Sequence, residues 1–189
     1  MKPVDQTDLD WERTGDEDEG GVVRRKRLGA AAGGEALGCS LHELPPGEGS
    51  WPYHWHAANE EAIYVLAGRG VVRLPDGEAR LSPGDYLARP AGPEGAHRVV
   101  NDGDEPLRYL VLSTMREPDV LGYPDADTVG VYAGSPPGGD ESERDVDAYF
   151  READAGGFPT DAGRGGDGAG SDGESGDGDR DAGENEGEG

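Results

Sequence analysis

The sequence predicts an all-β domain folded as a sandwich or a barrel. Between residues 20 and 134, short segments rich in valine, leucine, tyrosine and isoleucine alternate with glycine, proline and aspartate. Many short strands with turn signals at intervals of roughly 8–12 residues are typical of these folds. Pro75-Asp76-Gly77 has the composition of a tight turn between two strands. A region of about 115 residues is long enough to enclose one hydrophobic core.

Each apolar segment between two turn signals is expected to form one strand. Together these strands are expected to build a barrel over residues 21–134. In chain order the expected strands are Val22–Leu28, Ala36–Leu44, Ser50–His56, Ala62–Leu66, Gly70–Leu74, Ala79–Leu81, Asp85–Arg89, His97–Asn101, Leu107–Ser113 and Val129–Tyr132.

The segments on either side of the barrel have different patterns. Residues 1–20 are expected to form an irregular arm, in which Leu9 and Trp11 dock on the barrel. Residues 140–155 predict one short helix, because Ser142 can cap its start and Gly156-Gly157 would end it. The apolar side chains that recur there at helical spacing are Val146, Tyr149, Phe150 and Ala153.

Residues 156–189 are predicted to be a disordered acidic tail. They consist almost entirely of glycine, aspartate, glutamate, serine and alanine. Too few apolar side chains are present to offset the loss of backbone entropy on folding. The expected role of this tail is that of a solvating tether without a specific partner.

Acidic side chains dominate the whole chain. There are 41 Asp+Glu against 17 Lys+Arg, which gives a formal charge of -24, of which residues 140–189 carry -13. A protein of this charge is not expected to bind nucleic acid or an anionic membrane surface. The composition is rich in Asp, Glu, Gly and Ala and has only two lysines. In this it resembles proteins of salt-accumulating halophiles, in which molar salt screens the repulsion between acidic groups.

The sequence also predicts a cytoplasmic protein. No apolar run approaches the roughly 18 residues that a membrane span requires. The first residues show no secretory signal, because no apolar stretch follows a basic one. Cys39 is the single cysteine, so it has no partner for an internal disulfide and fits a reducing compartment.

Two of the four histidines form His54-Trp55-His56 within an expected strand. Because side chains alternate between the faces of a strand, both imidazoles point to one side and Trp55 to the other. Two imidazoles about 6–7 Å apart on one face can bind one metal ion. Glu61 follows after a return long enough to bring its carboxylate beside them. Taken alone, this pattern also fits two surface histidines without a metal.

Further matches downstream make the pattern more specific. The spacing G(x)5HxH(x)3-4E(x)6G is matched by His54, His56, Glu61 and Gly68. The spacing G(x)5PxG(x)2H(x)3N is matched by Gly84, Pro90, Gly92, His97 and Asn101. Through these two motifs the chain resembles the cupin superfamily over about residues 35–115, and within it the small single-domain cupins of bacteria and archaea. Two departures are present: Glu48 occupies the position of the first glycine, and four residues rather than two separate Gly92 from His97.

The resemblance implies a jelly-roll β-barrel with one divalent metal ion at its centre. Carried over residue by residue, the implied metal ligands are His54, His56, Glu61 and His97. Three neutral imidazoles and one carboxylate suit Mn, Fe, Co, Ni, Cu or Zn, and the sequence does not rank these ions. In a six-coordinate site, two positions remain for water, substrate or dioxygen. The alternative is that the longer loop before His97 removes this ligand and leaves weak or no metal binding.

Other polar residues receive structural interpretations. His42 fits neither motif and is expected to be an ordinary strand histidine. Asn101 is expected to hold backbone rather than to touch a substrate. Arg24-Arg25-Lys26-Arg27 is predicted to be a surface strand whose charge is neutralised by the nearby stretch Asp16–Glu19.

Two classes of function follow from the resemblance. The first is a metal-dependent enzyme acting on a small polar molecule, by sugar-phosphate-like isomerase chemistry or by dioxygenase chemistry. The alternative is a non-catalytic module that binds or senses a small molecule. A sugar phosphate would need a cationic clamp, for which only Arg73, Arg89 and Arg98 lie near the motifs. The sequence assigns no catalytic base.

The resemblance further implies a homodimer, since cupin barrels are commonly dimers. In such dimers, strands near the N-terminus pair with or cover the neighbouring subunit. The candidate contacts in this chain are therefore Trp11 and the strand that begins at Val22.

Overall fold

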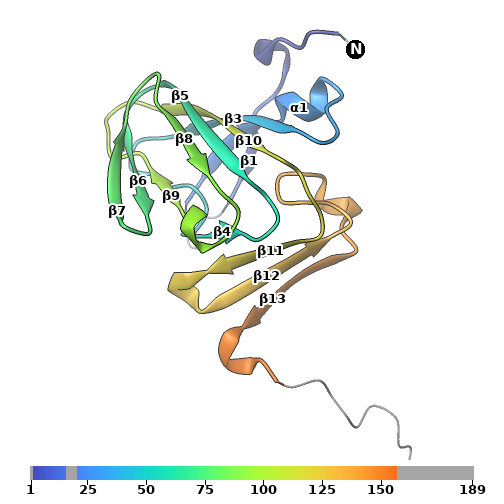
Figure 1. The fold of residues 1–189 in the computed structure, drawn as a ribbon. Coiled ribbons are helices and arrows are strands. Elements are labelled where there is room, and N and C mark those ends of the chain that lie inside the picture. The colour runs from blue at the N-terminus through green and yellow to red at the C-terminus, as the bar shows by residue number, and fades with distance from the viewer. Residues whose placement is uncertain (1, 16–20, 157–189) are drawn as a thin grey trace, which may run out of the picture. The chain divides into compact units, whose positions relative to one another are not determined.

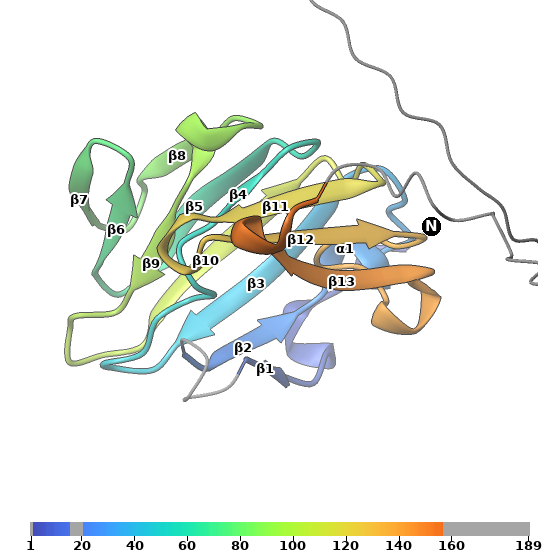
Figure 2. The same cartoon turned by 90° about the horizontal axis from the view of Figure 1, so that it is seen from below.

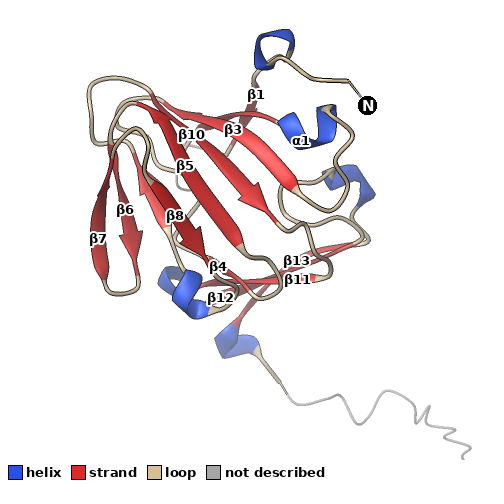
Figure 3. Ribbon diagram, turned by 45° about the horizontal axis from the view of Figure 1, so that its top comes forward, coloured by secondary structure: helices blue, strands red, loops and turns tan. Residues whose placement is uncertain are grey.

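Three antiparallel sheets enclose one hydrophobic core in the computed structural model, which describes residues 2–15 and 21–156. The all-β prediction is confirmed, and strands form most of the regular structure in Figure 3. The arrangement agrees with the expected jelly-roll barrel.

The largest sheet has six strands in the order β1-β2-β3-β10-β5-β8, and each neighbouring pair is antiparallel. It therefore joins the N-terminal segment to the middle of the chain. Its strands are β1 (Glu12–Thr14), β2 (Val23–Lys26), β3 (Gly38–Leu44), β5 (Glu61–Ala67), β8 (Tyr86–Arg89) and β10 (Leu107–Ser113).

Two smaller sheets complete the barrel. One has four strands in the order β13-β12-β11-β4 and the other has three in the order β7-β6-β9. Figures 1 and 2 show β11, β12 and β13 facing the six-stranded sheet, with β6, β7 and β9 at one end. The strands are β4 (Trp55–His56), β11 (Asp119–Tyr123), β12 (Thr128–Ala133), β13 (Val146–Arg151), β6 (Gly70–Leu74), β7 (Gly77–Leu81) and β9 (Arg98–Val100).

In residues 2–15 and 21–156, helical structure is limited to single turns. The one α-helical turn in these ranges is α1 (Leu28–Ala31). Within the described residues, no helix has the length and apolar character needed to span a membrane. The 3-10 turns are Gln6–Asp8, Pro93–Gly95, Pro124–Ala126, Glu141–Glu143 and Glu152–Asp154.

The core is built from inward-facing side chains of the large sheet and of the three-stranded sheet. Its fully buried members are Val23, Leu44, Ile63, Val65, Val72, Leu81, Val99, Leu107 and Tyr109. In the four-stranded sheet, Gly122 in β11 pairs with Trp55 in β4. A Cβ atom at position 122 would lie 2.2 Å from the indole of Trp55, so only glycine lets these two strands pair.

The predicted helix over residues 140–155 is wrong. Residues 146–151 form β13, which pairs with β12 along its whole length. The spacing that suggested an apolar helical face buries little, because Tyr149 and Phe150 remain more than half exposed. Pairing with the edge of β12 satisfies the backbone of this segment and overrides the local helical pattern. The barrel consequently extends beyond the predicted boundary at residue 134.

The N-terminal arm is more regular than predicted. β1 pairs with β2, and Trp11 packs under the ammonium of Lys26, 4.6 Å from the ring centroid. The run Arg24-Arg25-Lys26 forms β2, but the prediction of a surface strand is wrong for Arg25 and Lys26, which are buried. Glu12 in β1 accepts a hydrogen bond from Arg25 at 3.3 Å, and Lys26 donates one to the carbonyl of Gln6 at 2.7 Å.

Two predicted segments fall outside the described part of the chain. The acidic stretch Asp16–Glu19 lies among residues 16–20, and the acidic tail lies beyond Gly156.

We expect the core to be sensitive at Leu44, which is fully buried. Leu44→Ala should lower the free energy of unfolding by about 2–5 kcal/mol, because it removes buried methyl groups and leaves a cavity. Leu66→Ala is the control, since Leu66 is 44% exposed and should change stability by less than about 0.5 kcal/mol. Urea unfolding followed by circular dichroism measures both values. Equal losses in the two variants would contradict the assigned core.

Candidate metal centre

The structure brings His54, His56 and Glu61 together. Strand β4 contains His56, and His54 forms an isolated bridge with His97. The two imidazoles of the His54-Trp55-His56 segment face the same side, with ring centroids 5.0 Å apart. One donor atom from each of His54, His56 and Glu61 lies within 4.8 Å of the other two.

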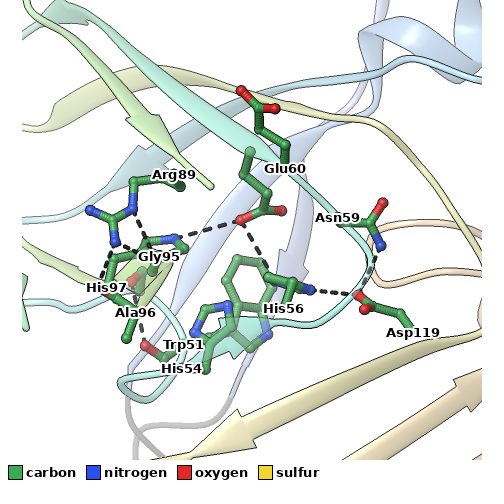
Figure 4. Close-up of polar contacts among 12 residues, drawn as sticks. Trp51, His54, His56, Asn59, Glu60, Arg89, Gly95, Ala96, His97 and Asp119 are labelled. Carbon is green, nitrogen blue, oxygen red and sulfur yellow. Dashed lines mark hydrogen bonds and ion pairs between the residues drawn. The ribbon is translucent and has the colours of Figure 1, made fainter. Parts of the chain in front are cut away.

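His97 lies against the same cluster. Its Nε2 is 3.6 Å from Oε2 of Glu61, and the Nε2 of His56 is also 3.6 Å from that oxygen. The dashed lines in Figure 4 show both contacts meeting at one carboxylate. The rings of His54 and His97 are 4.9 Å apart. All four side chains that the motifs selected therefore converge.

The longer loop before His97 is accommodated without displacing this residue. Its extra residues form the 3-10 turn Pro93–Gly95. The buried guanidinium of Arg89 donates hydrogen bonds to the carbonyls of Gly95 and Ala96, at 3.1 Å from Nε to Gly95. A Cβ atom at position 95 would lie 1.9 Å from the carbonyl oxygen of Pro90, so the turn requires glycine there. His97 then returns to pair with His54 through two backbone hydrogen bonds.

Each of the three imidazoles has an acceptor at Nδ1. His54 Nδ1 lies 2.7 Å from the carbonyl of Pro52, and His97 Nδ1 lies 3.2 Å from that of Gly95. His56 Nδ1 lies 2.7 Å from Oδ2 of Asp119. These acceptors assign the proton to Nδ1 and leave the Nε2 lone pair free. This is the tautomer that a metal-binding histidine needs.

Asp119 and Asn59 support His56 and were not found by sequence reasoning. Asp119, in β11, is fully buried and accepts hydrogen bonds from the backbone N–H of Ala58 at 2.9 Å and from Nδ2 of Asn59 at 2.8 Å. No motif spacing connects it with a histidine 63 residues earlier in the chain. The only available signal was Asn59 itself, a short polar side chain in the tight return between His56 and Glu61.

Burial controls the protonation of the cluster. It lowers the pKa of His54 to about 3, assisted by the charge of His56, and it lowers the pKa of His97 well below the usual range. For His56, burial also favours the neutral form, but Glu61 and Asp119 outweigh it and raise the pKa. Burial raises the pKa of Glu61, and His56 opposes this shift. At neutral pH the imidazoles of at least His54 and His97 are therefore uncharged, as metal ligands must be.

The donor set fits a divalent transition-metal ion. Three imidazoles with free Nε2 atoms and one carboxylate are ligands that such ions accept. The hydrogen bonds to Nδ1 hold the rings in orientation, as outer partners of metal-binding histidines commonly do. We therefore treat the cluster as a candidate metal centre.

The cluster faces a cavity of about 590 Å³ inside the barrel. Aromatic side chains form much of its wall, and Tyr123 stacks on His54 with the ring centroids 5.9 Å apart. The other aromatic members are His42, Trp51, Tyr109, Tyr132 and Tyr149. A cavity of this size is in the range of small-molecule sites.

His42 is placed in β3, as expected for a strand histidine, but it is buried and lines this cavity. Its ring lies 5.4 Å from that of Tyr109 and 5.6 Å from that of Trp51. Burial and the neighbouring charge of Arg25 lower the pKa of His42 to about 3.

Asn101 has the predicted structural role. It is fully buried, and its Nδ2 donates hydrogen bonds to the carbonyls of Leu44 and Glu105, each at 2.9 Å. These contacts join β3 to the loop before β10.

Comparison with known proteins supports the motif assignment. Residues 40–113 match the family model described as "Cupin domain". The chain is 30% identical over 120 residues to the tetracenomycin polyketide synthase protein TcmJ of Streptomyces glaucescens, covering 63% of this chain and 78% of TcmJ.

Two further proteins are similar. A glucose-6-phosphate isomerase of Pyrococcus horikoshii is 41% identical over 66 residues, which span 31% of this chain and only 34% of that enzyme. The crystal structure of a sugar phosphate isomerase from a cupin superfamily, from Silicibacter pomeroyi, superposes with a TM-score of 0.66 at 28% identity. It covers 80% of this chain and 94% of the other.

Asp119→Asn should weaken binding of Zn²⁺ or Mn²⁺ by about 10–100-fold, because an amide holds the Nδ1–H of His56 less firmly than a carboxylate does. Isothermal titration of the chelator-treated protein measures this. Asp102→Asn is the matched control, since Asp102 pairs with Arg80 away from the cluster. Unchanged affinity in Asp119→Asn would contradict the supporting role.

His42 should make the metal-free protein sensitive to acid. Below a pH of about 6.5 the unfolded chain protonates this histidine and the folded chain does not. The free energy of unfolding should therefore fall as the pH falls, with a contribution from His42 of up to about 1.4 kcal/mol per pH unit. In His42→Gln, the loss between about pH 6.5 and 5 should shrink by about 2 kcal/mol.

Urea unfolding at both pH values, with a chelator present, measures this difference. The comparison uses the change with pH within each protein, so a constant effect of the substitution on stability cancels. If the variant lost as much stability as the parent, the assigned burial of a neutral His42 would be incorrect.

Proposed function

Because this chain belongs to the cupin superfamily, we propose that His54, His56, Glu61 and His97 bind one divalent metal ion and that the protein is a metal-dependent enzyme. The proposed reaction is isomerase-like: a proton moves at a carbon next to a carbonyl in a small polar molecule. The observation that carries the proposal is the grouping of His54, His56 and Glu61, with His97 in contact with Glu61, on the wall of one cavity.

When bound, the ion would supply Lewis-acid polarisation of a substrate oxygen. The chain itself contributes the orientation of the substrate. Tyr123, stacked on His54, forms one wall beside the cluster. Burial raises the pKa of Tyr123, so its hydroxyl keeps its proton at neutral pH and serves as a hydrogen-bond donor rather than a base.

The contacts of Arg73 and Arg89 do not support a phosphate clamp. Arg73 pairs at the surface with Asp125, at 2.9 Å from Nη2 to Oδ1, and stacks on Tyr53. Arg89 is directed to the loop carbonyls before His97. Because the guanidinium groups of Arg73 and Arg89 already have these partners, we propose the reaction class of the isomerases named above without transferring their phosphorylated substrates.

The test is solvent-proton exchange. The full-length chain, loaded in turn with Mn²⁺, Fe²⁺, Ni²⁺ and Zn²⁺ in molar salt, is incubated in D₂O with sugars, sugar phosphates, β-diketones and phenols. Proton NMR should show metal-dependent loss of a signal next to a carbonyl for at least one compound. His56→Ala should reduce this rate by more than about 100-fold, because it removes a ligand. Glu60→Gln, at the exposed neighbour of Glu61, should leave it unchanged.

Two results would contradict the proposal. Oxygen consumption that accompanies turnover only with iron would instead identify a dioxygenase. Tight binding of an ion without exchange or turnover of any compound would identify a non-catalytic binding module.

A further inference from the structure

One row of side chains crosses the inner face of the six-stranded sheet beside the candidate metal centre. The strand register from β1 through β2 and β3 to β10 places in line Glu12, Arg25, His42 and Tyr109. The last three are all more than nine-tenths buried. They also line the same cavity as His54, His56 and Glu61.

This row contains three polar atoms without partners. Within residues 2–15 and 21–156, the Nε of Arg25, the Nδ1 of His42 and the hydroxyl of Tyr109 have no hydrogen-bond partner. Unpaired buried polar atoms destabilise a fold and are uncommon. Three of them side by side on adjacent strands, on the wall of a cavity, are expected where a ligand completes the hydrogen bonds.

The three unpaired groups are suited to bind a ligand that accepts hydrogen bonds. The Nε–H of a guanidinium can only donate a hydrogen bond. Burial, together with the nearby Glu61, raises the pKa of Tyr109, so its hydroxyl retains a proton that it can donate. His42 is neutral, because burial and Arg25 lower its pKa to about 3, and it offers one donor and one acceptor nitrogen.

The guanidinium groups at this edge of the cavity favour an anionic ligand. Glu12 is shared by two guanidinium groups, through Oε2 to Nη2 of Arg25 at 3.3 Å and through Oε1 to Nε of Arg27 at 3.1 Å. The carboxylate of Glu12 therefore contacts two guanidinium groups at this edge of the cavity. The unpaired Nε–H of Arg25 can donate a charge-assisted hydrogen bond to an anionic ligand.

We propose that Arg25, His42 and Tyr109 form a subsite for a singly charged oxygen group of the substrate, a carboxylate or a phenolate. The inference deepens the proposed function and rests on it: the reacting oxygen would face the histidine cluster and the second oxygen would face this subsite. Ile63 and Val111 lie in the next inward row of the sheet, between Tyr109 and Glu61, and provide an apolar surface for the carbon atoms between the two ends. A dianionic phosphate fits less well, because the guanidinium of Arg25 is already paired with the carboxylate of Glu12.

The test uses four probes that share one ring: benzoate, 4-nitrophenolate, phenyl phosphate and benzyl alcohol. Each is titrated into the full-length, chelator-treated protein at pH 8 and followed by NMR. At least one of the two monoanions should bind about tenfold more tightly than phenyl phosphate and benzyl alcohol. The stronger of benzoate and 4-nitrophenolate identifies which oxygen anion the subsite prefers.

Two variants locate the binding. Tyr109→Phe and Arg25→Lys should each weaken binding of the preferred monoanion about tenfold. Two matched controls, Tyr64→Phe and Arg24→Lys, change the same residue types at the outward-facing positions of β5 and β2 and should stay within about twofold. Tyr109→Phe should unfold at the same or a higher temperature than the parent, because it removes an unpaired buried hydroxyl. Loss of binding would therefore not reflect loss of the fold.

Equal affinities for all four probes, or monoanion binding that neither variant changes, would overturn the subsite. The proposed function is tested separately by titrating a divalent ion into the same variants, which should bind it as the parent does. If the parent bound no ion but its monoanion binding depended on Tyr109, the metal-dependent function would fail and the subsite would stand. If the parent catalysed proton exchange but its monoanion binding did not depend on Tyr109 or Arg25, only the subsite would fail.

Discussion

The candidate centre depends on the hydrogen bond between His56 and Asp119. A buried imidazole can present its Nε2 lone pair only if Nδ1 carries the proton, and Asp119 accepts that proton at 2.7 Å. The carboxylate is fully buried but not isolated, because Ala58 and Asn59 also donate to it. These hydrogen bonds outweigh burial and lower the pKa of Asp119, so it remains charged. One negative charge on β11 therefore orients a ring on β4 and joins the two strands.

The inner face of the large sheet combines two conflicting requirements. Val23, Leu44 and Val65 exclude water and stabilise the barrel, whereas Arg25, His42 and Tyr109 leave polar atoms unpaired on the same surface. A fold selected for stability alone would replace the unpaired groups with apolar side chains. Their concentration in one row, facing the cavity that contains the histidine cluster, is expected of a surface that gives up stability for ligand recognition.

The sequence predicted the features that depend on local geometry. Period-two alternation placed His54 and His56 on one side of a strand, and the short return placed Glu61 beside them. Asp119 could not be predicted, because its proximity to His56 arises from pairing between strands far apart in the chain. The same limit explains residues 146–151, which have a helical spacing of apolar residues but complete the edge of a sheet. The burial of Arg25 likewise depends on β1, which the sequence did not indicate.

The two ends of the cavity favour different oxygen groups of a ligand. The histidine end has donors suited to an ion and therefore favours an oxygen that can be polarised. The other end offers a guanidinium N–H and a protonated hydroxyl, which favour an oxygen that already carries charge. Ile63 and Val111 separate these ends and offer no hydrogen bonds of their own. A polyhydroxylated sugar chain would lose hydrogen bonds to water along this stretch, whereas a flat carbon skeleton with oxygens at both ends would not. If both proposed sites hold one substrate, we therefore expect enolic or phenolic compounds to bind better than open-chain sugars.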